Sequence, residues 1–231
     1  MKHSAKPKLA LFDLDHTLLD GDSDVLWCDF LIARGVLDAA EFGQRNAAMA
    51  RDYQAGSVSA QAFCDFYVST LARRTAVQWE PLRQAFLAEV VAPRIGGAAR
   101  ELVRQLQAEG ALVVLTSATN RFITELTAGE LGITHLIATD CELSPDGSFS
   151  GRTRGTLNMR EGKVARLRTW LAARGQALAD FESWAWSDSS NDLPLLQVVQ
   201  HAVVVHPDAR LAAEAARRGW PVLQLHAAPA R

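Results

Sequence analysis

The sequence predicts an α/β fold: a Rossmann-like parallel-sheet core that is interrupted early by an all-helical insertion. From residue 97 onward, helical and strand patterns alternate, which indicates βαβ units and a parallel sheet. Between residues 22 and 95 every periodic segment is helical. We therefore expect a core made of residues 1–20 and 94–231 and a helical cap at residues 21–93.

The length and composition fit a protein of this class. The chain has 231 residues, of which 48% are hydrophobic and 22% charged, so it can bury a sizeable core. Its 24 basic and 26 acidic residues leave a formal net charge of −2, which gives no indication of nucleic-acid or membrane binding. The sequence shows no signal peptide and no apolar run of membrane-spanning length. Three scattered cysteines form no C-x-x-C pair, so we expect free thiols in a cytoplasmic protein.

The expected elements follow in order along the chain. Residues 8–14 form an apolar run typical of a strand buried on both faces. Glycines and small polar residues then separate four helical stretches, at 22–35, 38–56, 59–74 and 76–91. In the core we expect strands at 111–117, 135–139, 183–187, 202–206 and 221–225, with helices between them. A Pro-Asp-Gly turn at 145–147 predicts two further short strands around it.

Polar residues occur where these strands end, and ligands of open parallel sheets bind beyond the carboxyl ends of the strands. The residues concerned are Asp13, Asp15, Thr116, Ser117, Asp188 and Asp192. Residues i and i+2 of an extended segment project to the same side, so Asp13 and Asp15 can converge on one site. Thr116 and Ser117 project to opposite sides; the spacing to Ala118 and Thr119 favours Ser117, and Thr116 stays an alternative.

This set of residues fits a phosphoryl group. Two carboxylates about 4 Å apart repel by roughly 4 kcal/mol at an effective dielectric of 20, so they call for a cation or a shared proton. Asp188 would complete an all-oxygen site suited to Mg²⁺. Lys163, at the start of a predicted helix, offers a positive charge, and Ser117 offers a hydroxyl donor. Each of these residues alone could be a helix cap, a turn or a surface residue, but their order along the strands favours a site.

Four short motifs resemble the signatures of the haloacid-dehalogenase-like hydrolases. They are D-L-D-H-T at 13–17, the strand ending in T-S-A-T, G-K at 162–163 and S-D-S-S-N-D at 187–192. The helical insertion resembles the cap of the phosphoserine-phosphatase-like branch, and the spelling of the motifs is most similar to bacterial members that include histidinol-phosphate phosphatases. The resemblance implies a Mg²⁺-dependent phosphomonoesterase that acts on a small phosphorylated metabolite through an aspartyl-phosphate.

The resemblance also implies a role for each matching residue. Asp13 would be the nucleophile, and Asp15 the general acid and then the general base. The metal contacts would be the Asp13 side chain, the main-chain carbonyl of Asp15 and the Asp188 side chain. Ser117 and Lys163 would hold the phosphoryl oxygens. Supporting positions would fall to Asp192, Thr17 and Asn191.

The leaving group is expected to meet residues at the start of the cap. The cap-side glutamate of the phosphoserine enzymes falls at Asp22, one methylene shorter, and their glycine pair is replaced by Ala118 and Thr119, which argues against phosphoserine. The substrate candidates are Asp22, Asp24, Asn120 and Arg121, although Arg121 could equally be a solvated residue of a first helical turn. Histidinol phosphate or a related amino-alcohol or amino-acid phosphate is the expected class. A phosphotransferase or mutase, and a non-catalytic signalling module phosphorylated on aspartate, are the alternative functions.

Overall fold

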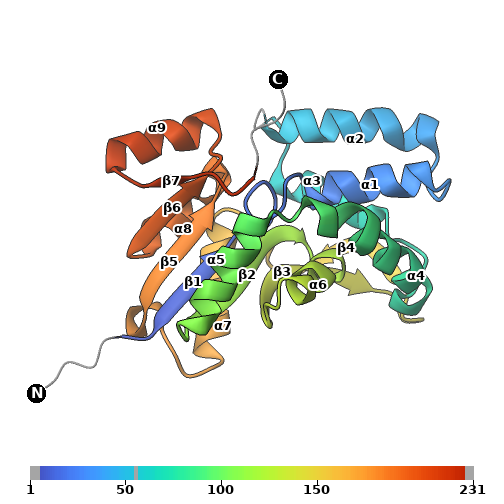
Figure 1. The fold of residues 1–231 in the computed structure, drawn as a ribbon. Helices are drawn as coiled ribbons and strands as arrows, with labels where there is room; N and C mark the ends of the chain where they lie inside the picture. The colour runs from blue at the N-terminus through green and yellow to red at the C-terminus, as the bar shows by residue number, and fades with distance from the viewer. Residues whose placement is uncertain (1–5, 55–56, 227–231) are drawn as a thin grey trace, which may run out of the picture.

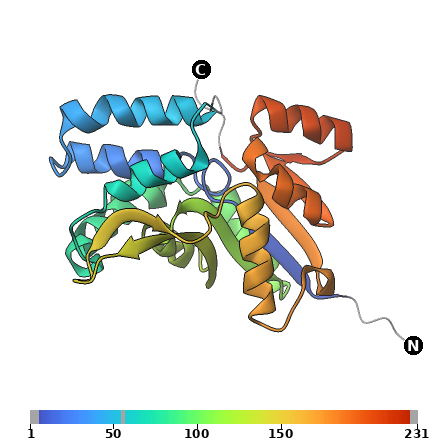
Figure 2. The same ribbon diagram turned by 180° about the vertical axis from the view of Figure 1, so that it is seen from behind.

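The structure is a computed structural model that describes residues 6–54 and 57–226. It contains a seven-stranded sheet in the order β4-β3-β2-β1-β5-β6-β7, in which only the β3–β4 pair is antiparallel. Helices cover both faces: α5 and α6 lie in front of the sheet in Figure 1, and α7 lies in front in the reverse view of Figure 2. The predicted fold class, an α/β core with a helical insertion, is confirmed.

The strands lie where the sequence patterns predict them, but β2 and β3 extend further than expected, and β1 and β7 are shorter. Their bounds are β1 Lys8–Phe12, β2 Leu112–Asn120, β3 His135–Leu143, β4 Phe149–Arg154, β5 Glu182–Ser187, β6 His201–Val205 and β7 Val222–Leu223. The expected strand at 111–117 continues to Asn120, through an irregular register with β3 between Ser117 and Asn120. The first of the two short strands expected beside the Pro-Asp-Gly turn is not separate. It is the end of β3, which changes partner from β2 to β4 at Asp140.

The helices lie in two groups. Between β1 and the first core helix come α1 Ser23–Ala33, α2 Ala39–Gln54, α3 Ala60–Ser69, α4 Ala76–Phe86, and the short turns η1 Leu87–Val91 and η2 Ala92–Arg94. The core adds α5 Gly97–Ala108, α6 Arg121–Glu130, α7 Glu161–Ala172, η3 Leu178–Asp180, η4 Ser190–Asp192, α8 Leu193–Val198 and α9 Ala209–Arg218. None of these helices is both long and apolar enough to cross a membrane, a finding limited to the residues the structure describes.

Strand β1 fixes the position of the residues that follow it. It lies in the middle of the sheet, paired with β2 and β5. Leu9 and Leu11 pack with the apolar residues of α7, α8 and α9, whereas Ala10 and Phe12 pack with those of α5, α6 and the insertion. All four side chains are fully buried. The next residue, Asp13, is therefore held rigidly at the carboxyl edge of the sheet.

The β3–β4 hairpin joins the core to the helical insertion. Asp65 on α3 accepts hydrogen bonds from the Thr153 hydroxyl at 3.1 Å and from its main-chain N–H at 3.5 Å. Gly151 has a φ of +85°, and a Cβ atom there would lie 3.1 Å from the Cβ of Ala72. The insertion thus rests on the hairpin as well as on the sheet edge, and its division from the core at residues 21 and 93 stays a prediction.

All three cysteines are free thiols in the described structure. Cys28 and Cys64 are buried in the insertion, and Cys141 is half-buried on β3. Burial raises the pKa of each thiol above its ordinary value, so the thiols stay protonated at neutral pH.

Candidate active site

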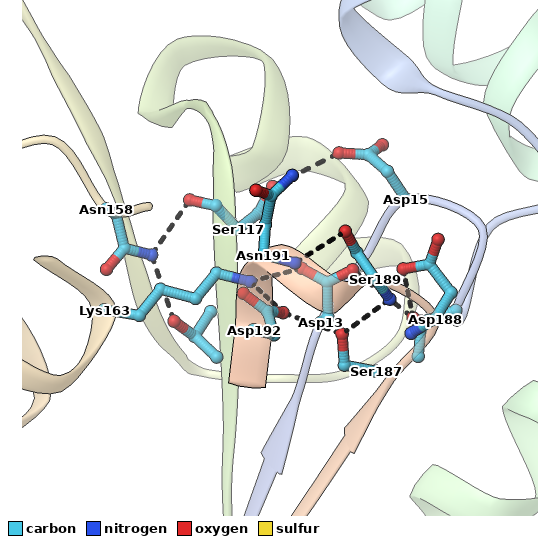
Figure 3. Close-up of polar contacts among 12 residues, drawn as sticks. Asp13, Asp15, Ser117, Asn158, Lys163, Ser187, Asp188, Ser189, Asn191 and Asp192 are labelled. Carbon is cyan, nitrogen blue, oxygen red and sulfur yellow. Dashed lines mark hydrogen bonds and ion pairs between the residues drawn. The ribbon is translucent and has the colours of Figure 1, made fainter. Parts of the chain in front are cut away.

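A lysine and two carboxylates form a buried ion-pair network at the carboxyl ends of β1 and β5. The Nζ atom of Lys163 lies 2.6 Å from Oδ1 of Asp13 and 2.6 Å from Oδ2 of Asp192 (Figure 3). The hydroxyl of Ser187, the last residue of β5, also donates to Asp192 Oδ2 at 2.8 Å. The Asp13 main chain is fixed to β5, because its N–H donates to the carbonyl of Trp186 at 3.0 Å. Lys163 thus neutralises part of the charge on Asp13 from a fixed position.

Close packing at position 162 requires a glycine immediately before this lysine. A Cβ atom at position 162 would lie only 2.0 Å from the carbonyl oxygen of Leu157, a distance that no side chain tolerates. The close approach folds the loop before α7 tightly onto the helix. Lys163 is consequently placed in the first turn of α7, with its side chain almost fully buried.

Thr17 bridges the two acids that are predicted to bind metal. Its Oγ1 atom lies 3.3 Å from Asp13 Oδ2 and 3.3 Å from Asp188 Oδ1, and it accepts a hydrogen bond from the Asp188 N–H at 3.1 Å. Because a hydroxyl has a single proton, Thr17 donates to one carboxylate at a time. The two carboxylates therefore face the same small region.

Asp15 is held on the side of the helical insertion. Its Oδ1 accepts from the main-chain N–H of Ser23, in the first turn of α1, at 2.7 Å. Its Oδ2 lies 3.0 Å from the hydroxyl of Thr119 and 3.4 Å from that of Ser117, both at the end of β2. Ser117 Oγ also accepts from the Thr119 N–H at 3.1 Å. The predicted phosphate-binding serine thus lies beside the predicted general acid.

Asn158 fixes the end of β2 and separates the two hydroxyl candidates. Its Nδ2 atom lies within 3.0 Å of the Thr116 hydroxyl, the Ser117 carbonyl and the Ile137 carbonyl. Thr116 therefore faces Asn158, while the Ser117 side chain faces Asp15, as strand alternation requires. Asn158 was not predicted as a site residue, because a lone amide in a predicted loop has no distinguishing pattern.

The positive charge of Lys163 offsets only part of the cost of burying the carboxylates of this site. Burial raises the pKa of Asp13 to about 7 in spite of Lys163, and Asp192 and Asp15 add to the rise. Burial, with the charge of Asp22, raises the pKa of Asp15 to about 6. Burial and the charge of Asp13 also hold the pKa of Asp188 well above its ordinary value. Burial acts against the charge on Lys163, but its two acidic partners outweigh this and raise its pKa, so the lysine stays protonated.

These residues fit a magnesium ion. The available donors are carboxylate, carbonyl and hydroxyl oxygens, which Mg²⁺ prefers. A divalent cation between Asp13 and Asp188 would relieve the repulsion that raises their pKa values. Within the described ranges, no three acidic, histidine or cysteine side chains converge as a ready cluster. A site built from two carboxylates and the Asp15 carbonyl agrees with this, since Mg²⁺ usually keeps several waters.

The other predicted residues take up different positions. Asp22 caps α1, accepting from the N–H groups of Asp24 and Val25 at 3.0 Å each. Asp24 is 2% exposed, and its oxygens lie 3.1 Å from Thr119 Oγ1 and 3.4 Å from Asn120 Nδ2. These contacts join α1 to the end of β2, so Asp24 and Asn120 hold the insertion against the core.

Two further predicted residues pair with arginine or aspartate partners. Arg121 Nε donates to Asp140 at 2.8 Å, and its Nη1 reaches the Leu136 carbonyl at 3.4 Å. Its guanidinium therefore lies along β3, away from the acids at the carboxyl ends of β1 and β5. Asn191, next to Asp192, accepts from Arg160 Nε at 3.0 Å. Arg160 was not predicted as a site residue.

Comparison with known proteins gives one family and several relatives. The family of haloacid dehalogenase-like hydrolases matches residues 10–197. A histidinol-phosphatase of Neisseria meningitidis is 42% identical over 216 residues, which cover 93% of this chain and 97% of that protein. The phosphoserine phosphatase SerB1 of Mycobacterium tuberculosis is 33% identical over 223 residues, which cover 92% of this chain and 69% of that protein.

Solved structures agree in fold. A Bordetella pertussis protein of unknown function superposes with a TM-score of 0.91 and 42% identity, over 96% of this chain and 100% of that one. A substrate-bound phosphoserine phosphatase superposes with a TM-score of 0.67 over 91% of both chains. At 18% identity, the second similarity shows a shared fold only.

Proposed function

Because this chain belongs to the haloacid dehalogenase-like hydrolase family, we propose that it is a Mg²⁺-dependent phosphatase that forms an aspartyl-phosphate on Asp13. The family and the enzyme class were both predicted from the sequence, and both are confirmed. The observation that carries the mechanism is the 2.6 Å ion pair between Asp13 and Lys163. This pair supports the proposed role of Asp13, because a fixed cation lies beside its carboxyl group at the carboxyl edge of the sheet.

In the first half-reaction, a carboxylate oxygen of Asp13 attacks phosphorus while the bond to the leaving oxygen breaks. Lys163 and the Ser117 hydroxyl bind phosphoryl oxygens, and Asp15 donates its proton to the leaving oxygen. A raised pKa of about 6 keeps part of the Asp15 population protonated at neutral pH. The contacts from Ser23 and Thr119 fix the orientation of the acid.

In the second half-reaction, Asp15 is a carboxylate and takes a proton from water as the water oxygen attacks phosphorus. The bond between Asp13 and phosphorus breaks, which releases inorganic phosphate and restores both aspartates. Magnesium, when bound by Asp13, the Asp15 carbonyl and Asp188, supplies charge stabilisation for the phosphoryl oxygens. Throughout both half-reactions, Thr17 fixes the position of the Asp13 side chain and Asp192 fixes that of Lys163.

For the substrate, we propose a small amino-alcohol phosphate such as histidinol phosphate. The histidinol-phosphatase is 42% identical to this chain over almost its whole length. The physical support is the pair of acids Asp15 and Asp22, which precede α1 and favour a cationic leaving group. Phosphoserine would bring a carboxylate toward these acids, so we expect it to be the poorer substrate. The cytoplasmic location stays a prediction.

The test is phosphate release from a panel of phosphorylated metabolites that includes histidinol phosphate and phosphoserine. We expect release in Mg²⁺ without any added acceptor, loss of release in EDTA, and a higher kcat/KM for histidinol phosphate than for phosphoserine. Release that requires an acceptor would indicate a phosphotransferase or mutase instead. A stable aspartyl-phosphate without turnover would indicate a signalling module. Activity that survives EDTA would contradict the proposed metal dependence.

A further inference from the structure

The turn that leads into Lys163 has an unfavourable backbone conformation. The N–H of Gly162 donates to the carbonyl of Met159 at 2.9 Å, which closes a four-residue turn. Arg160, the second residue of this turn, has φ 53° and ψ −127°. These are the angles of the first central position of a type II′ turn, which is dominated by glycine because a Cβ atom is strained there. An arginine at this position therefore requires an explanation.

The arginine side chain makes one hydrogen bond, and that bond places it at the catalytic edge. Its Nε donates to Asn191 Oδ1 at 3.0 Å. Asn191 lies in η4, the turn that ends with Asp192, the second partner of Lys163. Among the described residues, the remaining guanidinium nitrogens of Arg160 have no hydrogen-bond or ion-pair partner. A half-buried arginine with unused guanidinium donors is thus held by Asn191, the chain neighbour of Asp192.

The charge balance of the site indicates what these donors bind. In the described part of the chain, Lys163 is the one cation that pairs with Asp13 and Asp192, and Asp188 lies close by. A phosphate monoester would add negative charge to this group. The planar fork of an arginine binds phosphate oxygens in pairs, which a lysine cannot do.

We propose that Arg160 is a substrate-binding residue whose free guanidinium N–H groups contact the phosphoryl oxygens, in addition to Lys163. The proposal deepens the proposed function and rests on it, because it requires the phosphoryl group to lie at Asp13. Strained backbone is commonly kept at functional sites, where the side chain has a task that glycine cannot perform. The strained turn and the hydrogen bond to Asn191 then have the same effect, which is to position the guanidinium for the phosphoryl group.

The chain offers a matched control for this proposal. Arg73 also has a positive φ, of 67°, and its side chain is exposed. It follows α3 in the insertion, where its main-chain N–H donates to the Phe149 carbonyl of the hairpin. Arg73 thus shares a positive φ with Arg160 but makes none of the described contacts to the acid network.

The experiment compares Arg160→Gly, Arg160→Gln and Arg73→Gly in the full-length protein with Mg²⁺. Binding of inorganic phosphate is measured by calorimetry, and KM and kcat are measured with the best substrate of the panel. We expect both Arg160 variants to bind phosphate at least tenfold more weakly and to raise KM by more than they lower kcat. Arg160→Gly should keep or raise Tm, because glycine adopts the turn without strain. Arg73→Gly should keep the parental phosphate affinity.

Parental phosphate affinity in both Arg160 variants would overturn the proposal. A raised KM with unchanged phosphate binding would also overturn it, because Arg160 would then contact the leaving group. If Arg160→Gly lowers Tm, Arg160→Gln decides the question, since it keeps the parental backbone preference and removes the charge. If the parent binds phosphate through Arg160 but hydrolyses no phosphate ester, the proposed function fails and this inference stands. If the parent is an active phosphatase and the Arg160 variants match it, only the inference fails.

Discussion

Two buried aspartates on opposite sides of the site are stabilised in opposite ways. Asp192 and Asp24 are 3% and 2% exposed. Asp192 lies 2.6 Å from the ammonium of Lys163, whereas the polar partners of the Asp24 carboxyl group, among the residues described, are the uncharged side chains of Thr119 and Asn120. A buried carboxylate requires a cation or a proton. Burial accordingly raises the pKa of Asp24 well above its ordinary value, which favours the neutral carboxylic acid.

The same contrast separates the two catalytic aspartates. Asp13 lies on the side of Lys163, which favours the anion that a nucleophile needs. Asp15 lies on the side of Asp24, and the two acids share the Thr119 hydroxyl at 3.0 and 3.1 Å. A protonated Asp24 can donate to Thr119, which then donates its single proton to Asp15. On the core side Asp13 thus faces a fixed cation, whereas on the side of the insertion Asp15 and Asp24 face uncharged donors; burial raises the pKa of the acids on both sides.

The largest effect is expected for Asp13→Asn, which removes the nucleophile of the proposed mechanism. We expect kcat to fall by at least about 10⁴-fold, because an amide does not form the aspartyl-phosphate. Phosphate release measures the rate, and far-UV circular dichroism should show an unchanged fold. A kcat within tenfold of the parental value would rule out Asp13 as the nucleophile.

Lys163→Met tests whether the stability of the protein depends on the cation that faces Asp13 and Asp192. The substitution leaves Asp13 and Asp192 without a positive partner, and breaking a buried ion pair costs about 3–5 kcal/mol. Urea unfolding measures the free energy of unfolding. The control is Lys8→Met, which breaks the more exposed Lys8–Glu109 pair and should cost less than about 1 kcal/mol. Equal losses in the two variants would contradict the account.

Thermal unfolding with and without Mg²⁺ tests whether a bound cation offsets the negative charge that Lys163 leaves uncompensated. The pKa of Asp13 rises from 3.8 to about 7 and that of Asp15 to about 6, so the folded protein binds these protons more tightly than the unfolded chain does. Their contribution to stability is fully present below pH 3.8 and is lost as pH rises through 6 and 7. At 100 times its Kd, Mg²⁺ should stabilise the protein by about 2.7 kcal/mol at pH 8.

At pH 5 we expect a smaller rise in Tm with Mg²⁺, because protons compete for the same carboxylates. Asp188→Ala removes one proposed ligand and should shift the Mg²⁺ titration to higher concentration. An Mg²⁺ effect that is independent of pH, or an unchanged titration in Asp188→Ala, would argue against this metal site.

The smallest expected effect is that of Asp24→Asn, compared with Asp192→Asn. An asparagine can donate to Thr119 as a protonated aspartic acid does, so the free energy of unfolding at pH 7 should change by no more than about 0.5 kcal/mol. Asp192→Asn removes the charge that faces Lys163 and should cost about 2 kcal/mol. Chemical denaturation measures both variants. A larger loss for Asp24→Asn than for Asp192→Asn would reverse the proposed division of charge.

The sequence contained enough information to predict the fold and the group of polar residues at the strand ends. The buried run of β1 and the alternation after residue 97 follow from local periodicity, and the strand-end rule then brings Asp13, Asp15 and Asp188 to one edge. Lys163 and Ser117 also lie at that edge.

Features that depend on distant partners could not be predicted in the same way. Asp24 was predicted as a substrate candidate at the start of the cap, and its burial comes from packing between α1 and the end of β2. Asn158 acts through contacts with β2 and β3, and no local pattern indicates them. The φ angle of Arg160 follows from the tight loop around Gly162, whereas arginine itself gives no sign of a positive φ.

The central claim is that Asp13 carries the phosphoryl group during turnover, and acid-quenched mass spectrometry tests it most directly. The protein is mixed with Mg²⁺ and its best substrate, quenched within one turnover, and digested. We predict one added phosphoryl group on the peptide that contains Asp13, with more of it in Asp15→Asn, because the second half-reaction lacks its general base. Rapid turnover with no phosphorylated Asp13 peptide, or a phosphoryl group on another residue, would contradict the account.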